Sequence, residues 1–226
     1  VIALRDPDPR TDGQGAEHLR ARGIQVEMGL MAQEAASAMR GFVLRQTLGR
    51  PAVTLKLGLS LDGCIALKDG SSRWITGEAA RAHAHLERAR HDAILVGGGT
   101  LRADKPRLDV RPRGLEHRSP RRLLLSHGGA PKGWEAIAHP EDIAALAHVD
   151  HLLIEGGAAA AASFLHADLV DRLLLYRAPI LIGSGLPGIG DIGLSDLAQA
   201  HGRWRLTGGR TLGEDRLEVY ERQRSA

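Results

Sequence analysis

The sequence predicts an α/β fold in which a mostly parallel sheet is flanked by helices and closed by an antiparallel C-terminal edge. Three observations lead to this fold class. From residue 52 onward, short apolar runs typical of buried strands alternate with helical segments. Several of these runs end in glycine-rich turns, as strands do at the ligand edge of an open α/β sheet. The last two strand-like runs follow one another directly, which is typical of a hairpin.

Before residue 49 the pattern is short and mostly helical. Gln14–Arg22 is predicted as a helix, and Ile24–Glu27 alternates like a strand. Gln33–Leu48 follows as one longer helix, and the proline shortly after it disfavours any continuation. We therefore expect two domains, which comprise residues 1–48 and 49–226.

After this boundary, the elements can be assigned in chain order. The expected strands are Ala52–Gly58, Ala93–Val96, Arg122–Leu125, His151–Ile154, Leu173–Tyr176, Pro179–Ile182, Arg203–Thr207 and Leu217–Tyr220. The expected helices are Glu78–Arg90, Ile143–Ala147 and Ala158–His166. On the first of these helices, we expect Ala79, Ala82 and Leu86 to face the core. A glycine-rich turn around Gly208 and Gly213 is expected to join the last two strands.

Composition narrows the functional classes. Hydrophobic residues make up 43% of the 226-residue chain, which is enough for a core, but aromatic residues only 3%. So few aromatic rings argue against single-stranded nucleic-acid binding by stacking. The net charge is +3, and no run of basic residues indicates a nucleic-acid stripe. No apolar run is long enough to span a membrane, so we expect no membrane partner.

Two further features bear on the setting of the chain. The single cysteine, Cys64, excludes an intrachain disulfide and a multi-cysteine metal site, so we expect a buried small residue there and a cytoplasmic location. Because the first residue is Val1 and not methionine, we expect this chain to be part of a longer polypeptide. A homo-oligomer is expected.

Two strand exits are suited to anions. Gly156 and Gly157 lie between a predicted strand and an alanine-rich helix, where backbone N–H groups and the helix dipole favour a phosphate. A tight turn that simply needs glycine explains this pair equally well. Gly97–Thr100 is a second such exit, where Thr100 can cap a following helix. The spacing does not match the three-glycine dinucleotide fingerprint.

Lys56 stands near the end of a hydrophobic strand, where an unpaired buried ammonium is costly. A functional position explains it better than the core. Gly58 lies two residues on, on the same face, and leaves room for a ligand. The chain has 26 arginines and four lysines. The forked guanidinium of an arginine can bind a phosphate through two hydrogen bonds.

Five segments together closely resemble one family. They are Lys56–Gly63, Ser71–Gly77, Ile94–Thr100, Asp104–Leu108 and Leu153–Gly157. In this order they resemble the reductase domain of the bifunctional riboflavin-biosynthesis deaminase–reductase, from about Arg50 to the C-terminus. The resemblance implies a dihydrofolate-reductase-like fold. It also implies NADPH-dependent reduction of the ribose of 5-amino-6-(5-phosphoribosylamino)uracil to the ribityl product.

The resemblance also implies roles for single residues. Lys56 and Glu155 would manage protonation at the sugar. The substrate would be bound by Ser72, Arg88, Leu108, Arg111 and Glu155, with Arg111 as the best candidate for its phosphate. The cofactor would be bound by Gly58, Trp74, Thr100, Asp104, Ser126, Gly157, Ala158, Ala159, Ala160, Ala161, Ala162 and Ser163.

Residues 1–48 resemble the end of the family's deaminase domain but contain neither its His-Ala-Glu motif nor its Pro-Cys-x-x-Cys motif. We therefore expect no metal site and no deamination on this chain. The alternatives are a reductase of the 2,5-diaminopyrimidinone sugar phosphate, a dihydrofolate-type pterin reductase, and a non-catalytic nucleotide-binding module.

Overall fold

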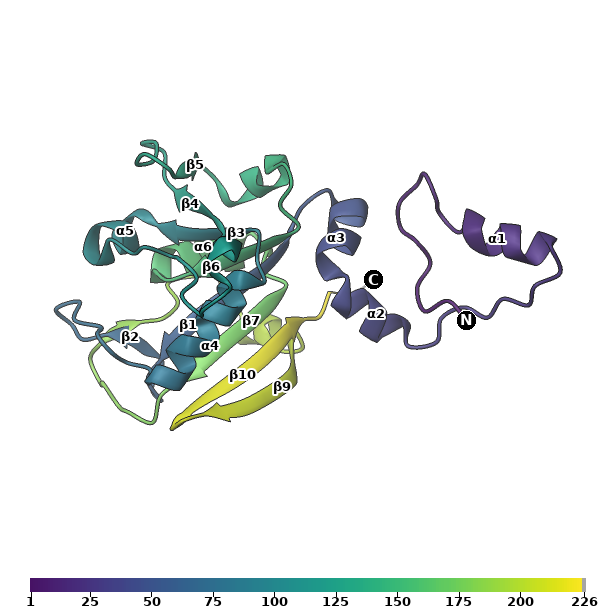
Figure 1. The fold of residues 1–226 in the computed structure, drawn as a ribbon. Helices are drawn as coiled ribbons and strands as arrows, with labels where there is room; N and C mark the ends of the chain where they lie inside the picture. Colours follow the sequence, from purple (N-terminus) through teal and green to yellow (C-terminus); the bar gives the residue numbers. More distant parts are fainter. Residues whose placement is uncertain (225–226) are drawn as a thin grey trace.

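The computed structural model of the protein describes residues 1–224. These residues form one eight-stranded sheet with the order β5-β4-β3-β6-β1-β7-β10-β9 (Figure 1). The strands from β5 to β7 pair in parallel, whereas β10 is antiparallel to both of its neighbours. The predicted fold class is therefore confirmed. The strands are β1 Ala52–Leu59, β3 Ala93–Gly97, β4 Arg121–Leu125, β5 Glu135–Ile137, β6 His151–Glu155, β7 Arg172–Arg177, β9 Trp204–Leu212 and β10 Asp215–Arg222.

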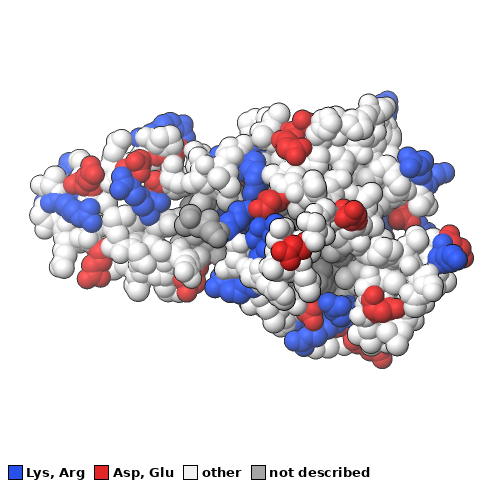
Figure 2. Space-filling model, turned by 180° about the vertical axis from the view of Figure 1, so that it is seen from behind, with Lys and Arg blue, Asp and Glu red and all other residues white. Residues whose placement is uncertain are grey.

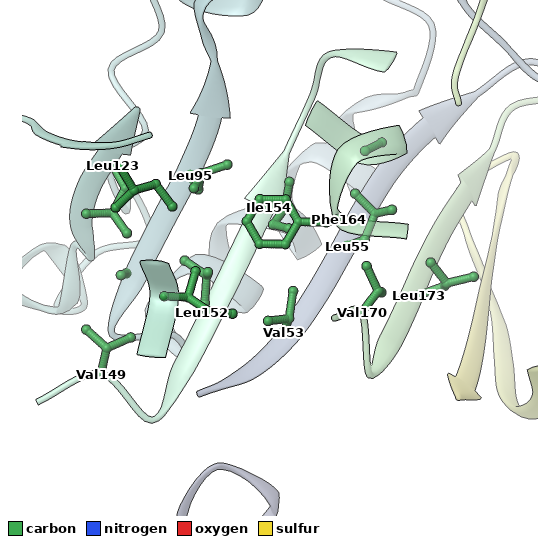
Figure 3. Close-up of a cluster of buried hydrophobic side chains, with 14 of the residues drawn as sticks. Val53, Leu55, Leu95, Leu123, Val149, Leu152, Ile154, Phe164, Val170 and Leu173 are labelled. Atoms are coloured by element: carbon green, nitrogen blue, oxygen red, sulfur yellow. The ribbon is translucent and has the colours of Figure 1, made fainter. Parts of the chain in front are cut away.

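Helices cover both faces of this sheet (Figure 1). The helix α6 (Ala158–His166) packs on one face through Phe164, which lies among Leu55, Ile154 and other fully buried side chains (Figure 3). Each such side chain stabilises the fold by ~1.5–3 kcal/mol. Because successive residues of a strand alternate in direction, Lys56 and Glu155 must face the opposite side of the sheet.

That opposite side is covered by α4 (Glu78–Ala89), and its buried face differs from the expected one. Ala79, Ala82 and Leu86 are exposed, whereas the buried residues include Ala80, His83, Ala84 and Glu87. The prediction was wrong because it placed apolar residues alone toward the core. His83 and Glu87 lie four residues apart and are buried together with charged partners from β7 and β9.

The N-terminus of α4 is capped from a distant strand. Gly77 precedes the helix, and its backbone N–H donates to the Asp215 carboxylate at 2.6 Å. Asp215 is only 3% exposed. Its side chain therefore takes the part that the N3 carboxylate plays in a capping box, where it accepts from the N–H of the N-cap residue.

We expect Asp215→Ala to lower the melting temperature, because it removes the carboxylate to which the Gly77 N–H donates, at a cost of about 0.5–2 kcal/mol. Calorimetry measures the shift. Asp196→Ala is the matched control, because Asp196 accepts from Ala198 N–H at 2.9 Å at the start of an exposed four-residue 3₁₀ helix, Leu197–Ala200. Equal shifts in the two variants would contradict the capping role.

The first part of the N-terminal segment, around α1 (Gln14–Ala21), lies apart from the sheet in Figure 1, whereas α3 (Arg40–Leu48) lies beside the sheet. The helix α2 (Ala32–Ala38) lies between them in the chain. The single helix predicted over 33–48 is therefore divided at Met39, and the bend accompanies a close approach of α3 to β6. A Cβ on Gly41 would lie 2.5 Å from His151. The strand predicted over 24–27 is absent from the described residues, where this part of the chain makes only the isolated bridge Ile2–Met28.

Three further predictions need correction. Pro179–Ile182 is not a strand, because its proline lacks an N–H and the Ile182 N–H turns to Asp62. The small strand there is β8 (Leu186–Pro187), which pairs with β2 (Cys64–Ala66). Residues near Ile143 form a 3₁₀ helix, Pro140–Ala145, and Gly208 lies inside β9 and not in its turn. A third 3₁₀ helix, Glu116–Arg118, precedes β4.

Positive and negative side chains are interspersed on the face shown in Figure 2. Charged side chains are also paired inside the molecule, as in the buried bidentate pair of Arg50 and Asp171 at 2.8 and 2.9 Å. Among the described residues, no helix has the length and apolar character needed to cross a membrane.

Candidate active site

The centre of the candidate site is a buried carboxylate held by two cations. Glu155 ends β6, and the parallel register places it beside Lys56 of β1. Arg88 of α4 donates to both oxygens of Glu155, at 2.7 and 2.8 Å. Lys56 Nζ lies 3.9 Å from the nearer of these oxygens, which is an ion-pair distance but too long for a hydrogen bond. The three residues come from three elements, and the sheet face under α4 brings them together.

These charges determine the ionisation of Glu155. Burial alone would raise its pKa, but the Lys56 charge and the Arg88 hydrogen bonds outweigh burial and lower the pKa from 4.5 to about 2. Glu155 is therefore a carboxylate at neutral pH and cannot donate a proton there. Within residues 1–224 the structure gives no hydrogen bond to the Lys56 ammonium, so its N–H groups are available to a ligand.

The glycine pair after β6 forms a cradle that side chains would fill. Gly156 and Gly157 have φ values of +84° and +81°, which favour glycine. A Cβ on Gly157 would lie 2.9 Å from Thr100 Oγ1, and one on Gly156 would lie 3.3 Å from Thr100 Cγ2. The first backbone N–H groups of α6 have no partner within the helix. These groups fit an anion such as a cofactor pyrophosphate.

The helix that follows buries part of the predicted cofactor segment. Ala160, Ala161 and Ala162 are 3%, 0% and 7% exposed, because they pack α6 against the sheet. Ser163 turns its hydroxyl to the Ala159 carbonyl at 3.0 Å. Only the start of the segment, Gly157–Ala160, offers free backbone donors. The binding of the cofactor by Gly157–Ser163, through backbone donors and Ser163, stays a prediction, but the buried side chains of Ala160, Ala161 and Ala162 can take no part in it.

Thr100 is also placed differently from its expected capping role. The helix α5 (Gly98–Asp104) begins before it, with Gly97 as its N-cap residue. Thr100 therefore lies in the first turn and packs against the Gly156–Gly157 pair. The two glycine-rich exits are thus brought together, as predicted for the ligand edge of this sheet.

The loop after β2 contributes Ser72 and Trp74. Trp74 is 68% exposed and is not a core anchor. The Arg81 guanidinium lies over its ring, 4.7 Å from the centroid. Arg73 donates to the Asp104 carbonyl at 3.2 Å, which ties this loop to the end of α5. Ser72 beside it is half-buried.

The segment after α5 carries Leu108 and Arg111. Leu108 is 4% exposed, and Arg111 is exposed with its Nε 3.1 Å from Asp109 Oδ1. The Asp109 carbonyl also accepts from Arg88 at 3.1 Å. This segment is therefore attached to the Glu155 cluster, and Arg111 is free to turn toward a ligand. The fork of Arg88 is already occupied by Glu155.

Two more of the predicted cofactor residues, Ser126 and Gly58, have close neighbours of their own. Ser126 follows β4, and its hydroxyl accepts from the Gly128 N–H at 3.1 Å. Gly58 does not leave open space at its own position, because a Cβ there would lie 3.3 Å from Thr76. Cys64 is 6% exposed, as expected for a buried small residue.

The sequence reasoning missed a buried polar group beside Lys56. Tyr176 of β7 lies under the Lys56 ammonium, and its hydroxyl meets His83 Nδ1 at 2.7 Å. The spacing of His83 and Glu87 on one helix face was the available signal. Nothing in the local sequence links either residue to Tyr176 or to Arg210 of β9.

Comparison with known proteins decides the family. The model of the RibD C-terminal domain matches residues 51–133 and 141–217. RibD from Mycobacterium tuberculosis is 37% identical over 232 residues, which is 96% of this chain and 68% of that protein. The chain belongs to the RibD C-terminal domain family. The predicted resemblance from about Arg50 onward is therefore confirmed.

Other RibD proteins agree with this family assignment. RibD from Escherichia coli is 32% identical and aligns with 88% of this chain and 68% of its own length. A bifunctional deaminase and reductase from Thermotoga maritima superposes with a TM-score of 0.85 at 28% identity, over 99% of this chain and 71% of the other. RibD from Acinetobacter baumannii superposes with the same TM-score at 29% identity, over 99% and 73%.

Proposed function

We propose that this chain reduces the ribose of 5-amino-6-(5-phosphoribosylamino)uracil to the ribityl product, with NADPH as the reductant. The observation that carries the proposal is the cluster of Lys56, Glu155 and Arg88 directly before the Gly156–Gly157 cradle. Glu155 directly precedes the turn that is suited to an anion, and the Lys56 ammonium, with its free N–H groups, lies beside Glu155. The family membership supports the same activity.

NADPH, when bound, supplies a hydride to the anomeric carbon of the opened ribose, and a proton completes the reduction. Lys56 Nζ is the group that can donate to a sugar atom at this point, because Glu155 is ionised at neutral pH. The Glu155 carboxylate forms ion pairs with both Arg88 and Lys56. Its negative charge thereby keeps the Lys56 ammonium at the site. Arg88 holds the carboxylate in one orientation by donating to both of its oxygens.

The remaining predicted residues can be divided between the two ligands. On the substrate side we assign Ser72, Leu108 and Arg111, with Arg111 for the phosphate. On the cofactor side we assign Thr100, Asp104, Trp74 and Ser126, with the backbone N–H groups of Gly157–Ala160 for the pyrophosphate. Arg88 acts on the substrate through Glu155 and not as a phosphate ligand.

Loss of absorbance at the nicotinamide band tests the proposal directly. The parent chain is mixed with NADPH and the aminouracil sugar phosphate, and we expect oxidation of one NADPH per ribityl product. The 2,5-diaminopyrimidinone sugar phosphate and NADH serve as comparison substrates and should react more slowly. No turnover with the aminouracil, or faster turnover with the diaminopyrimidinone, would contradict the proposal.

Arg111→Ala should raise KM for the phosphorylated substrate while the affinity for NADPH stays within about twofold. Loss of a charge-assisted hydrogen bond costs about 1.5–3 kcal/mol, which corresponds to a roughly tenfold to hundredfold change in KM. Arg113→Ala is the matched control, because Arg113 is an exposed neighbouring arginine. An unchanged KM in the Arg111 variant would remove Arg111 from the phosphate site.

We also propose that residues 1–48 and 49–226 are separate domains, the first being the end of a deaminase-like domain. The family model begins at residue 51, while the alignment with the Mycobacterium tuberculosis relative takes in 96% of the chain. Limited proteolysis tests the boundary. Cleavage near Gly49 should release a stable C-terminal fragment that still binds NADPH.

A further inference from the structure

Tyr176 is a buried tyrosine beside the candidate active site. It is 1% exposed, and it lies on the sheet face that carries Lys56, because β7 pairs with β1 in register. Lys56 Nζ lies 5.4 Å from the centroid of its ring. This distance is within the range at which a cation is attracted to an aromatic face.

The Tyr176 hydroxyl is fixed by a histidine whose tautomer follows from its neighbours. His83 Nε2 is in contact with the Arg210 guanidinium, which can only donate. His83 Nε2 must therefore accept, and the ring proton must be on Nδ1. Nδ1 then donates to the Tyr176 hydroxyl oxygen at 2.7 Å. Arg210, His83 and Tyr176 form a directed chain of hydrogen bonds from the edge strand toward Lys56.

The surroundings of His83 support this neutral form. Burial lowers its pKa most, and the Arg210 charge lowers it further, against the smaller effect of Glu87. Glu87 Oε1 lies 3.8 Å from His83 Nε2 and is itself paired with Arg90 at 2.7 Å. Arg172 lies at 4.0 Å on the other side of this carboxylate.

We propose that Tyr176, held by His83 and Arg210, is a positioning residue that sets the place of the Lys56 ammonium. The proposal deepens the proposed function and rests on it. Lys56 makes no hydrogen bond to Glu155, so the opposite charge and the aromatic ring hold its ammonium without using its N–H groups. All of these donors remain available to the sugar, while the ring restricts where the ammonium can go.

The position of Lys56 can be measured without turnover. The chain has only four lysines, so the ε-methylene signals of Lys56 can be resolved by NMR and assigned with Lys56→Met. The Tyr176 ring current should shift the ε-methylene proton signals of Lys56 away from the corresponding signals of Lys68, Lys105 and Lys132. Tyr176→Leu should abolish this shift, and Tyr176→Phe should retain it. An unchanged shift in Tyr176→Leu would overturn the proposal.

A kinetic cycle tests whether Tyr176 acts through Lys56. Tyr176→Leu should lower kcat about tenfold, with KM for NADPH little changed, and Tyr176→Phe should recover most of kcat because it restores the ring. In the Lys56→Met background, Tyr176→Leu should cause no further loss. A multiplicative loss in the double variant would show a merely structural role and overturn the proposal.

Arg210→Ala provides a second variant if Tyr176→Leu does not fold, because Arg210 lies on the exposed edge strand β9. Its smaller loss of kcat should also disappear in the Lys56→Met background, and persistence of the loss there would overturn the proposal. If the parent turns over no substrate, the proposed function fails, whereas the NMR shift still tests the placement of Lys56.

Discussion

Glu155→Gln should lower kcat by about 10²–10⁴-fold, the range typical of residues that control proton transfer. Glutamine has the size of glutamate but no charge, so Arg88 and Lys56 would lose their shared anion. Arg88 would no longer be held by two acceptor oxygens, and Lys56 would lose the opposite charge that keeps it at the site. The measurement is single-turnover oxidation of NADPH with saturating substrate.

The control for this variant is Glu141→Gln, which changes an exposed glutamate in the 3₁₀ helix Pro140–Ala145. It should retain the parent kcat and melting temperature. If Glu155→Gln also kept the parent kcat, Glu155 would have no part in the reaction. The Arg88 pair would then be a structural feature of the sheet face.

The same variant should show a defined dependence of stability on pH. The folded-state pKa of Glu155 is lowered from 4.5 to about 2, so its charge favours the folded state above the unfolded pKa. The stabilisation is lost as pH falls through about 2. Glu155→Gln should therefore be less stable than the parent at neutral pH, and the difference should shrink on acidification. Denaturant titrations across this range measure it, and a difference that grew toward low pH would contradict the paired carboxylate.

The sequence predicted the sheet well because its signals are local. Buried parallel strands such as Ala93–Gly97 are continuous apolar runs, and their glycine-rich exits are visible without any tertiary information. The turn at Gly156 and Gly157 is of the same kind, since positive φ values restrict the residue type there. The family resemblance then placed Lys56 and Glu155 in one site, and strand register explains why they meet.

What the sequence did not reveal depends on contacts between distant segments. His83, Tyr176 and Arg210 come from a helix, a central strand and an edge strand, so no local pattern connects them. The buried face of α4 was misjudged for the same reason. A histidine and a glutamate are ordinarily surface residues, and only the cations opposite them make their burial favourable.

Gly157→Val should weaken NADPH binding more than tenfold, by two effects that the structure separates. At φ +81° and ψ +111°, outside the left-handed helical region, a β-branched residue is strained, by roughly 1–3 kcal/mol. The added side chain would also begin 2.9 Å from Thr100 Oγ1, so Thr100 must move or the turn must open. Either change displaces the first N–H groups of α6 from the place where the pyrophosphate is proposed to bind.

Gly157 is half-buried and is the N-cap residue of α6, so this change acts on the fold as well as on the cofactor. We therefore expect a lower melting temperature without cofactor as well. The cofactor effect is isolated by comparing the rise in melting temperature that NADPH produces in each protein.

Gly99→Val is the matched control, because Gly99 lies in the neighbouring glycine run with open space around it and no positive φ. It should keep most of the NADPH-induced rise, and Gly157→Val should lose it. If Gly157→Val binds NADPH as tightly as the parent, the glycine pair serves only the turn, the pyrophosphate binds elsewhere, and Gly97–Thr100 is the next candidate for its site.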